Sequence, residues 1–337
     1  MKMPAGKIPT DVLREVVFKN LGARKDEVAL GPSVGFDGAI VNLGDKSLIV
    51  SMDPVTGAIE NIGWLAVHVN ANDIATFGVK PEFFLSCILL PENSKQETLE
   101  TIAVQMDKAA KELGIAIIGG HCEVTPKLPN PIVIGCAIGT AKKGKYVTAG
   151  GAKTGDKIIL TKSAGIEGTA ILASDKENEL KKKLRVKTLL NAKRFYDKIS
   201  VVQEAVLAFN TGVVRAMHDP TEGGLAGGMH EMADASNLGF EIYKEKILVA
   251  SETAQICDFF RIDPLQLTAS GSLLIAADRN SADMVVQLLN KNQINANIIG
   301  EFCSSQTKRS IVNERGKREN LVRPVSDHLW LALQCSP

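Results

Sequence analysis

The sequence predicts an α+β protein of two domains, each built from alternating helices and strands. The chain has 337 residues, which corresponds to two domains of ~150 residues each. Apolar residues make up 45% of the chain and charged residues 23%, as in an ordinary globular protein rather than a disordered chain, a coiled coil or a collagen-like fibre. A break rich in Gly, Lys and Thr covers residues 144–155, so we expect domains over residues 1–147 and 148–337.

The first half alternates helical and strand patterns. Thr10 to Leu21 places its apolar residues on one face and stops at Gly22, which predicts a helix. Residues 61–77 are almost entirely apolar, which predicts a buried helix. The elements expected here are helix 10–21, strands 39–43 and 47–52, helix 61–77, strand 83–90, helix 94–113, and strands 115–118 and 131–140.

The second half continues the alternation after a charged stretch at residues 175–187. A turn punctuated by glycines, residues 163–169, separates a short strand from the helix that follows. The elements expected here are strand 157–161, a helix ending at residue 173, helices 201–217 and 224–237, strand 273–276, helix 282–291, strand 297–301, a hairpin within 311–322 and a short helix after residue 326.

Charge and cysteine usage exclude several classes of function. The net charge is +1, so no overall field attracts nucleic acid or an anionic membrane. The basic stretches 181–185 and 308–323 lack interleaved aromatic residues and are typical of solvated surface. Six cysteines are dispersed without a C-x-x-C pair, which argues against a zinc site and a disulfide framework and favours mostly buried free thiols. With no long apolar run and no signal-peptide pattern, we expect a cytoplasmic protein.

Three aspartates in the first half are candidate ligands for a divalent cation. Asp73 lies in the nearly all-apolar helix, where a carboxylate is costly unless it is paired, hydrogen-bonded or bound to a metal. Asp37 lies in a turn flanked by glycine, and Asp53 ends a strand. Oxygen ligands in such places suit Mg²⁺, particularly when it also binds phosphate. The alternative for Asp73 is a carboxylate that caps a neighbouring loop.

Glycine-rich turns offer candidate phosphate contacts. H-D-P-T-E-G-G, residues 218–224, precedes an amphipathic helix whose free N–H groups attract anions. G-G-H-C-E, residues 119–123, follows an apolar strand. Residues 139–145 have the glycine spacing of a P-loop, but Tyr146 replaces the Ser or Thr that would hold Mg²⁺, and no G-x-G-x-x-G follows a strand. Any nucleotide therefore binds in another way.

The order of five motifs resembles the aminoimidazole ribonucleotide synthetase (PurM-like) superfamily. Within it, G-K-I-P at residues 6–9 and M-H-D-P-T-E-G-G-L look most like the family of hydrogenase expression/formation protein HypE and its archaeal relatives, as do residues 198–202 and 269–274. The resemblance covers the chain from Gly6 to about Glu301. The five motifs are D-G-A (37–39), S-M-D (51–53), A-N-D-I-A-T-F-G (71–78), G-G-H-C-E-V (119–124) and H-D-P-T-E-G-G-L (218–225).

The resemblance implies a PurM-like two-domain fold. Its N-terminal domain would form a shared β-barrel in a homodimer, with ATP near that interface, and its C-terminal domain would be an α/β sandwich. Site residues transfer position by position. The implied Mg²⁺ ligands are Asp37, Asp53, Asp73 and Asp219. The implied nucleotide contacts are Lys7, Asp37, Asn72, Gly119, Gly120, Glu123, Thr221, Gly223 and Gly224. The implied catalytic residues are Asp73, His121, Asp219 and Cys335.

The resemblance also implies a reaction. Enzymes of the superfamily activate an amide or similar oxygen with the γ-phosphoryl group of ATP, while Mg²⁺ and Lys neutralise the developing charge. In the HypE family the substrate is a carbamoyl group on the enzyme's own C-terminal Cys, which is dehydrated to a thiocyanate. Partners would be a carbamoyltransferase and iron-centre assembly proteins.

Two positions depart from the family pattern. Cys122 replaces the usual Thr of the G-G-H-T segment, and Cys335 is followed by Ser336 and Pro337 instead of ending the chain. Three other superfamily activities stay open: an AIR synthase-type cycloligase, a thiamine-phosphate kinase and a selenide-activating enzyme. The last is disfavoured because the first cysteine is Cys87. A paralogue that binds ATP without turnover also stays open.

Overall fold

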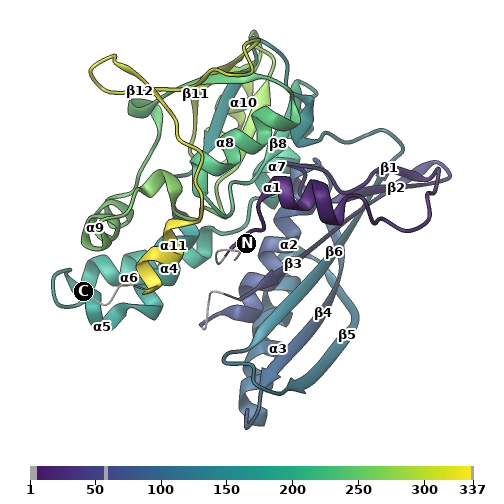
Figure 1. Cartoon of the computed structure of the whole chain (residues 1–337), viewed down its shortest axis with the longest axis vertical. Helices are drawn as coiled ribbons and strands as arrows, with labels where there is room; N and C mark the ends of the chain where they lie inside the picture. The colour runs from purple at the N-terminus through teal and green to yellow at the C-terminus, as the bar shows by residue number, and fades with distance from the viewer. Residues whose placement is uncertain (1–5, 57–59, 335–337) are drawn as a thin grey trace.

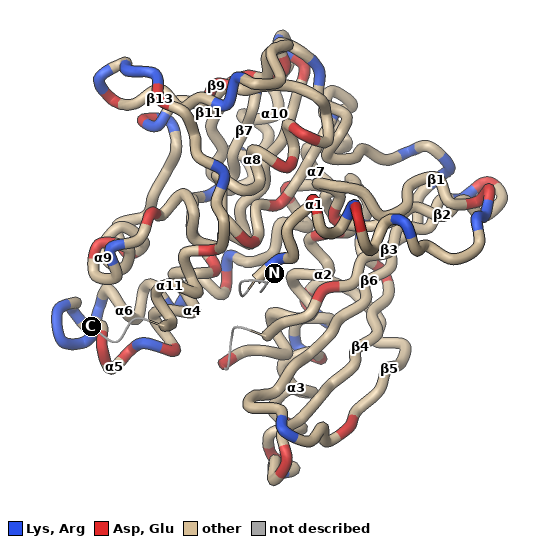
Figure 2. The backbone as a smooth tube through the Cα atoms, viewed as in Figure 1, with Lys and Arg blue, Asp and Glu red and all other residues tan. Residues whose placement is uncertain are grey.

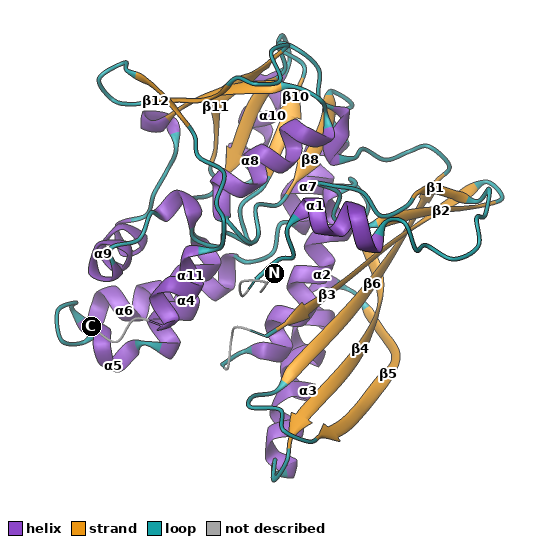
Figure 3. Cartoon of the chain, viewed as in Figure 1, coloured by secondary structure: helices purple, strands orange, loops and turns teal. Residues whose placement is uncertain are grey.

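The computed structural model describes residues 6–56 and 60–334. Two mixed sheets lie side by side, with helices between and around them (Figures 1 and 3). The chain changes from the first sheet to the second between Lys142 and Lys157, and the domain boundary at residues 147 and 148 stays a prediction. None of the helices in the described part of the chain is both long and apolar enough to cross a lipid bilayer.

The first sheet has the strand order β1-β2-β3-β6-β4-β5 and is antiparallel except for the parallel pair β4–β5. Helices α2 and α3 pack together, and α2 lies on β3 and β6. Strand β5 pairs only with β4 among the described strands, so its other edge is free. The elements are β1 (Val28–Leu30), β2 (Ala39–Leu43), β3 (Lys46–Val55), α2 (Ile62–Thr76), β4 (Pro81–Pro91), α3 (Gln96–Leu113), β5 (Ala116–Thr125) and β6 (Ile132–Lys142).

The second sheet has the order β13-β12-β9-β11-β7-β10-β8 and is antiparallel except for the parallel pair β12–β9. Its strands and the longer helices around it follow in chain order. They are β7 (Lys157–Thr161), α4 (Ile166–Asp175), α6 (Val186–Lys193), α7 (Val202–Phe209), β8 (Val214–His218), α8 (Gly224–Ala235), β9 (Gly239–Tyr243), α9 (Ser251–Phe260), β10 (Leu274–Ala277), α10 (Ala282–Lys291), β11 (Ala296–Cys303), β12 (Arg309–Val312), β13 (Arg318–Asn320) and α11 (His328–Gln334).

The apolar core is continuous across the two halves. Side chains alternate along β7, so Ile159 faces one cluster and Ile158 the other. The cluster on the Ile159 side also contains the buried residues of α2, α4, α7 and the first sheet. The cluster on the Ile158 side is covered by α8. Helix α2 is therefore buried almost all round, as its apolar sequence predicts.

Most of the predicted elements are present, and three predictions are wrong. The helix expected over residues 201–217 ends at Phe209, turns at Gly212 (φ +75°) and continues as β8, because Val214–His218 pairs with β10. The strand expected to end at residue 118 runs to Thr125, so G-G-H-C-E is edge strand rather than turn. The helix expected over 10–21 is a short α-helix, α1 (Thr10–Val12), followed by one π-helical segment (Leu13–Val17).

The cysteines in the described part of the chain are free, as predicted, but they are not mostly buried. Of the five in the described part of the chain, only Cys257 is buried. Cys122 is exposed because it lies on the edge strand β5, and Cys87 and Cys136 are half-buried on the neighbouring strands β4 and β6. Cys335 lies outside the described residues.

The side-chain amide of Asn72 on α2 is one of the contacts that join the first half of the chain to the second. Asn72 is fully buried; its Nδ2 donates to the Ile199 carbonyl at 2.8 Å, and its Oδ1 accepts from the Val201 N–H at 2.8 Å. Both the Nδ2 and the Oδ1 atoms of Asn72 thus bond to the backbone of the second half, and the phosphate contact that the resemblance implies for Asn72 stays a prediction.

Replacing Asn72 by Ala would leave two buried backbone groups without partners. We expect the free energy of unfolding to fall by on the order of 2–4 kcal/mol, measured by urea denaturation. A matched control is Asn292→Ala, which removes an exposed side-chain bond to the Leu288 carbonyl and should change stability by less than about 0.5 kcal/mol. Equal denaturation midpoints for Asn72→Ala and the wild type would contradict this account of the junction.

Candidate functional site

Four aspartates from both halves of the chain form what we call the carboxylate cluster: Asp37, Asp53, Asp73 and Asp219. Asp37 precedes β2, Asp53 lies on β3, Asp73 on α2, and Asp219 directly follows β8. Carboxylate oxygens of Asp37 and Asp219 and a ring nitrogen of His218 lie within 4.8 Å of one another. Burial and the charges of the other three aspartates raise the pKa of Asp73. The four residues therefore share one electrostatic environment.

The first half holds its members of the cluster through two polar side chains. Ser51 Oγ lies 2.6 Å from both Asp73 Oδ2 and the Asp37 carbonyl. Asn70 on α2 accepts from the Asp53 N–H at 2.8 Å and donates to the Asp53 carbonyl at 3.2 Å. The backbone of β3 is thus fixed against α2, and Asp53 keeps its position beside Asp73.

Asp219 is the least compensated member of the cluster. It is fully buried, and neither of its carboxylate oxygens has a hydrogen-bond partner among the described residues. Burial, with the charge of Asp37, raises its pKa to about 8, and burial raises the pKa of Asp53 to about 6. A buried carboxylate without partners is costly, and hard oxygen donors in this number suit a divalent cation such as Mg²⁺.

Two basic side chains border the cluster. His218 is buried between Asp37 (Nδ1 to Oδ2, 2.8 Å) and Glu231 of α8 (Nε2 to Oε2, 2.9 Å). Burial alone would lower the pKa of His218, but these two carboxylates raise it to about 10. Lys7 Nζ lies 3.8 Å from Glu231 Oε1 and 3.3 Å from Thr221 Oγ1. His218 therefore ties the two halves together, whereas Lys7 stands at the open side of the cluster.

The start of α8 is already occupied by a side chain. Gly223 (φ +80°) and Gly224 (φ +59°) form the turn, and the Gly223 N–H donates to Asp327 Oδ2 at 2.6 Å. The Gly224 N–H donates to the Thr221 carbonyl at 3.0 Å. Neither glycine N–H is free for a phosphate, although Thr221 stays directly beside Lys7.

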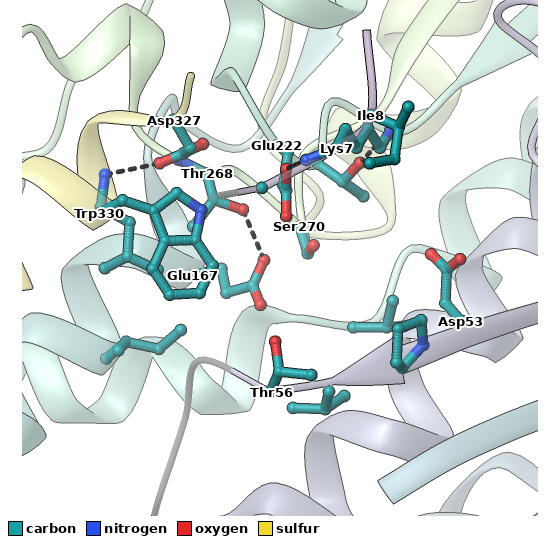
Figure 4. A pocket seen from close by; sticks show the side chains of 17 residues that line it. Lys7, Ile8, Asp53, Thr56, Glu167, Glu222, Thr268, Ser270, Asp327 and Trp330 are labelled. Carbon is teal, nitrogen blue, oxygen red and sulfur yellow. Dashed lines mark hydrogen bonds between the residues drawn. The ribbon is translucent and has the colours of Figure 1, made fainter. Parts of the chain in front are cut away.

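A cavity of about 550 Å³ extends away from the carboxylate cluster. At one end it is lined by Asp53, Lys7 and Thr221, which also belong to or border the cluster. The other end, which we call the acceptor end, contains carboxyl, hydroxyl and indole groups (Figure 4). Its polar and aromatic residues are Glu167, Thr268, Ser270, Asp327 and Trp330, whereas Glu222 lies beside Lys7, whose backbone N–H it accepts at 2.7 Å.

The structure does not bring the β5 residues to this cavity. His121 and Glu123 are exposed on the edge strand, where they contact each other at 3.1 Å (Nε2 to Oε2). Gly119 and Gly120 belong to the same exposed strand. None of the four lines the cavity or belongs to the carboxylate cluster of this chain. Cys335, the remaining predicted residue, lies outside the described residues.

Several residues of the site are not singled out by the sequence pattern. Glu167 lies in the glycine-containing segment 163–169, whose sequence predicts a turn before a helix but no function for this residue. Asp327 and Trp330 approach the cavity from the end of the chain, so their role depends on a long-range packing that no local pattern reports. Asp327 Oδ1 accepts from the Leu329 N–H (2.6 Å) and the Thr268 N–H (3.2 Å), which docks α11 beside the cavity.

Comparison with known proteins identifies the family. Residues 35–141 match the AIR synthase related protein N-terminal domain, and residues 153–313 match the corresponding C-terminal domain. A putative hydrogenase expression/formation protein of Methanocaldococcus jannaschii is 30% identical over 330 residues, covering 96% of this chain and 95% of the relative. The chain belongs to the hydrogenase expression/formation protein family. Its PurM-like two-domain fold, predicted from the motifs, is confirmed.

Further members of this family are named for their activity or partner. Carbamoyl dehydratase HypE of Rhizobium leguminosarum is 30% identical over 246 residues, which are 70% of this chain and 66%, just under two thirds, of that relative. A solved HypE–HypF complex contains a chain with a TM-score of 0.76 and 23% identity, covering 93% of this chain and 99% of that one. A HypE structure in complex with ATP gives a TM-score of 0.71 at 21% identity, covering 96% of both chains. At this level of identity, these two structures show that the fold is shared.

The uncompensated charge of Asp219 predicts a gain in stability on its removal. In EDTA, Asp219→Asn should raise the free energy of unfolding at pH 8 by on the order of 1–2 kcal/mol. Because the pKa of Asp219 is raised on folding, its destabilising effect grows as the pH rises from about 4 to 8, so the gain should be smaller at pH 5. The exposed Asp45→Asn is the matched control for urea denaturation. A variant less stable than the wild type at pH 8 would contradict this account.

Proposed function

We propose that this protein is a Mg-ATP-dependent hydrogenase maturation enzyme that dehydrates a carbamoyl-type amide group to a thiocyanate. The observation that carries the proposal is the carboxylate cluster, with its unpartnered Asp219, at one end of a cavity whose other end carries protein carboxylates. Membership of the hydrogenase expression/formation family and the named activity of the HypE relatives support it. The proposal keeps the cytoplasmic location expected from the sequence.

Mg²⁺ fits the donor set of the cluster. Asp37, Asp53, Asp73 and Asp219 would hold it, since their oxygens are hard donors and those of Asp219 have no other partner. When bound there, Mg²⁺ would neutralise the negative charge that develops on the phosphoryl oxygens. Lys7, beside Thr221 at the cavity mouth, is placed to contact the same phosphoryl group. Together these residues position and activate the γ-phosphoryl group for transfer.

The acceptor end of the cavity favours an amide over the phosphorylated or anionic acceptors of the alternative activities. Glu167 and Asp327 line it, Glu222 lies nearby beside Lys7, and Lys7 is the one basic residue among the described residues that line the cavity. A thiamine phosphate, a phosphorylated purine intermediate or an ionised selenide would meet like charge there, which costs free energy in a partly dehydrated site. A neutral carbamoyl group, whose N–H groups donate hydrogen bonds, meets acceptors instead.

We further propose that the protein works as a homodimer through the first sheet. Strand β5 has a free edge, and the large apolar side chains Met52, Ile118 and Val124 are more than half exposed (63%, 54% and 57%). Charged residues are sparse along this part of the chain trace (Figure 2). Pairing of this face with a second copy would bury the apolar side chains. Gly119, Gly120, His121 and Glu123 would then lie at the interface, where they can contribute to nucleotide binding and catalysis.

Cys335 is the proposed carrier of the carbamoyl group. It follows directly on α11, the helix that presents Trp330 to the acceptor end of the cavity. The proposal therefore needs a carbamoyltransferase partner to load this thiol and iron-centre assembly proteins to receive the product. A solved complex in which a HypE chain binds a second protein, HypF, is in keeping with a protein partner.

Intact-mass analysis of the carbamoylated chain tests this function. The full chain carrying a carbamoyl group on Cys335 should lose the mass of one water when Mg-ATP is added, with one ADP formed per chain. Cys335→Ser should accept no carbamoyl group, whereas the matched control Cys303→Ser should behave as the wild type. An unchanged mass on the carbamoylated wild type would contradict the proposal. ATP binding without this mass change would instead favour a non-catalytic paralogue.

A further inference from the structure

Glu167 occupies a position between the carboxylate cluster and the acceptor end. It lies in the first turn of α4 and lines the cavity together with Trp330 and Thr56 (Figure 4). Its Oε2 accepts from Thr268 Oγ1 at 2.9 Å. Its charge acts on Asp53 at one end of the cavity and on Asp327 at the other. Glu167 is therefore near both the place where phosphoryl transfer is proposed and the place where the acceptor would lie.

Asp327 and Glu222, which also line the cavity, accept hydrogen bonds from backbone N–H groups. Asp327 accepts from the N–H groups of Gly223, Thr268 and Leu329. Glu222 accepts from the Lys7 N–H at 2.7 Å. Glu167 accepts from the Thr268 hydroxyl through Oε2, and the hydroxyl and backbone N–H of Ser270 lie close to the same carboxylate. No hydrogen bond of normal geometry reaches Glu167 Oε1 from the described residues, so Glu167 keeps one oxygen for a ligand.

A second observation at the same place points to a ligand. Ser270 is 1% exposed and lines the cavity, and its hydroxyl has no hydrogen-bond partner that meets normal geometry, although it lies close to the Glu167 carboxylate. A buried hydroxyl without a partner is uncommon in a folded protein. A polar group bound between Ser270 and Glu167 would satisfy both side chains.

We propose that Glu167 is the general base that removes the first N–H proton of the acceptor amide, an inference that rests on the proposed function. As the amide oxygen bonds to the γ-phosphorus, the bond from that phosphorus to ADP breaks. One N–H bond breaks at the same stage; its proton passes to Glu167 and its electron pair forms the C=N bond. Ser270 hydrogen-bonds the same amide group and holds it against Glu167.

The second stage completes the dehydration without another reactant. The carbon–oxygen bond to phosphate breaks, the remaining N–H bond supplies the electron pair of the C≡N bond, and the second proton leaves with the phosphate. Glu167 returns the first proton to solvent, so the enzyme ends in its starting state. Burial raises the pKa of Glu167, which makes its carboxylate a better proton acceptor than an exposed glutamate.

A purely structural role for Glu167 makes a different prediction. A glutamate in the first turn of a helix stabilises the helix through its charge, and Glu252 has the same place in α9, where it bonds Asn191 outside the cavity. If Glu167 acted in this way only, Glu167→Gln and Glu252→Gln would lower stability alike and leave the rate of dehydration unchanged. Glu252→Gln is therefore the matched control.

The test measures the rate of water loss from the full chain carrying the carbamoyl group on Cys335, in Mg-ATP. We expect Glu167→Gln to slow this rate on the order of 10²–10⁴-fold, with the Mg-ATP-induced rise in Tm retained and Glu252→Gln at the wild-type rate. Glu167→Ala should be equally slow and should recover part of its rate in formate, a small carboxylate that fits the space left. Wild-type chain that loses no water would overturn the proposed function and this inference together.

Three results would overturn the inference about Glu167 while leaving the proposed function intact. The first is a Glu167→Gln rate close to that of the wild type. The second is loss of the Mg-ATP-induced rise in Tm in Glu167→Gln, which would place the residue in nucleotide binding instead. The third is a Glu167→Ala rate that formate leaves unchanged.

Discussion

The burial of four carboxylates around one point is the interaction on which the rest of the site depends. Asp219 has no partner for either carboxylate oxygen, and Asp37, Asp53 and Asp73 repel it. The surrounding structure enforces such a cluster, and protonation of its members or binding of a cation lowers its cost. We propose that binding of a metal nucleotide is the functional reason for this local loss of stability.

Contacts between the two halves of the chain hold the carboxylate cluster together. Asn72 fastens α2 to the backbone at Ile199 and Val201, and His218 bridges Asp37 to Glu231. The apolar cluster that runs through α2 makes these contacts rigid. The aspartates of the first half and Asp219 of the second half are thus held in one fixed arrangement. The same contacts fix the shape of the neighbouring cavity.

Part of this account could be predicted from the sequence. Asp73 could be predicted as a site residue because a carboxylate inside an apolar helix is costly unless it binds a partner. The motifs around Asp37, Asp53 and Asp219 indicated the superfamily. Local patterns failed where partners distant in sequence decide the outcome. Val214–His218 reads as a helix until its pairing with β10 is known, and G-G-H-C-E reads as a turn although β4 extends it as a strand.

The acceptor end of the cavity was beyond prediction for the same reason. Trp330 reaches it from α11, the last helix of the described chain, and Asp327 directly precedes that helix. Glu167 contacts Thr268, which is 101 residues away in sequence, so no local pattern indicates its place in the cavity. Charge, burial and hydrogen-bond partners at such positions are properties of the assembled cavity. The carboxylate cluster, where we propose phosphoryl transfer, could therefore be predicted from the sequence, whereas the end of the cavity where we propose that the acceptor binds became visible only in the structure.

The claim that the carboxylate cluster binds Mg-ATP is tested most directly by thermal unfolding with and without the metal nucleotide. A ligand at about 100 times its Kd stabilises the folded state by about 2.7 kcal/mol. We predict a clear rise in Tm for the wild type and none for Asp73→Asn, which removes one charge of the cluster. A wild type whose Tm is unchanged in millimolar Mg-ATP, or an Asp73→Asn variant with the full rise, would contradict the account.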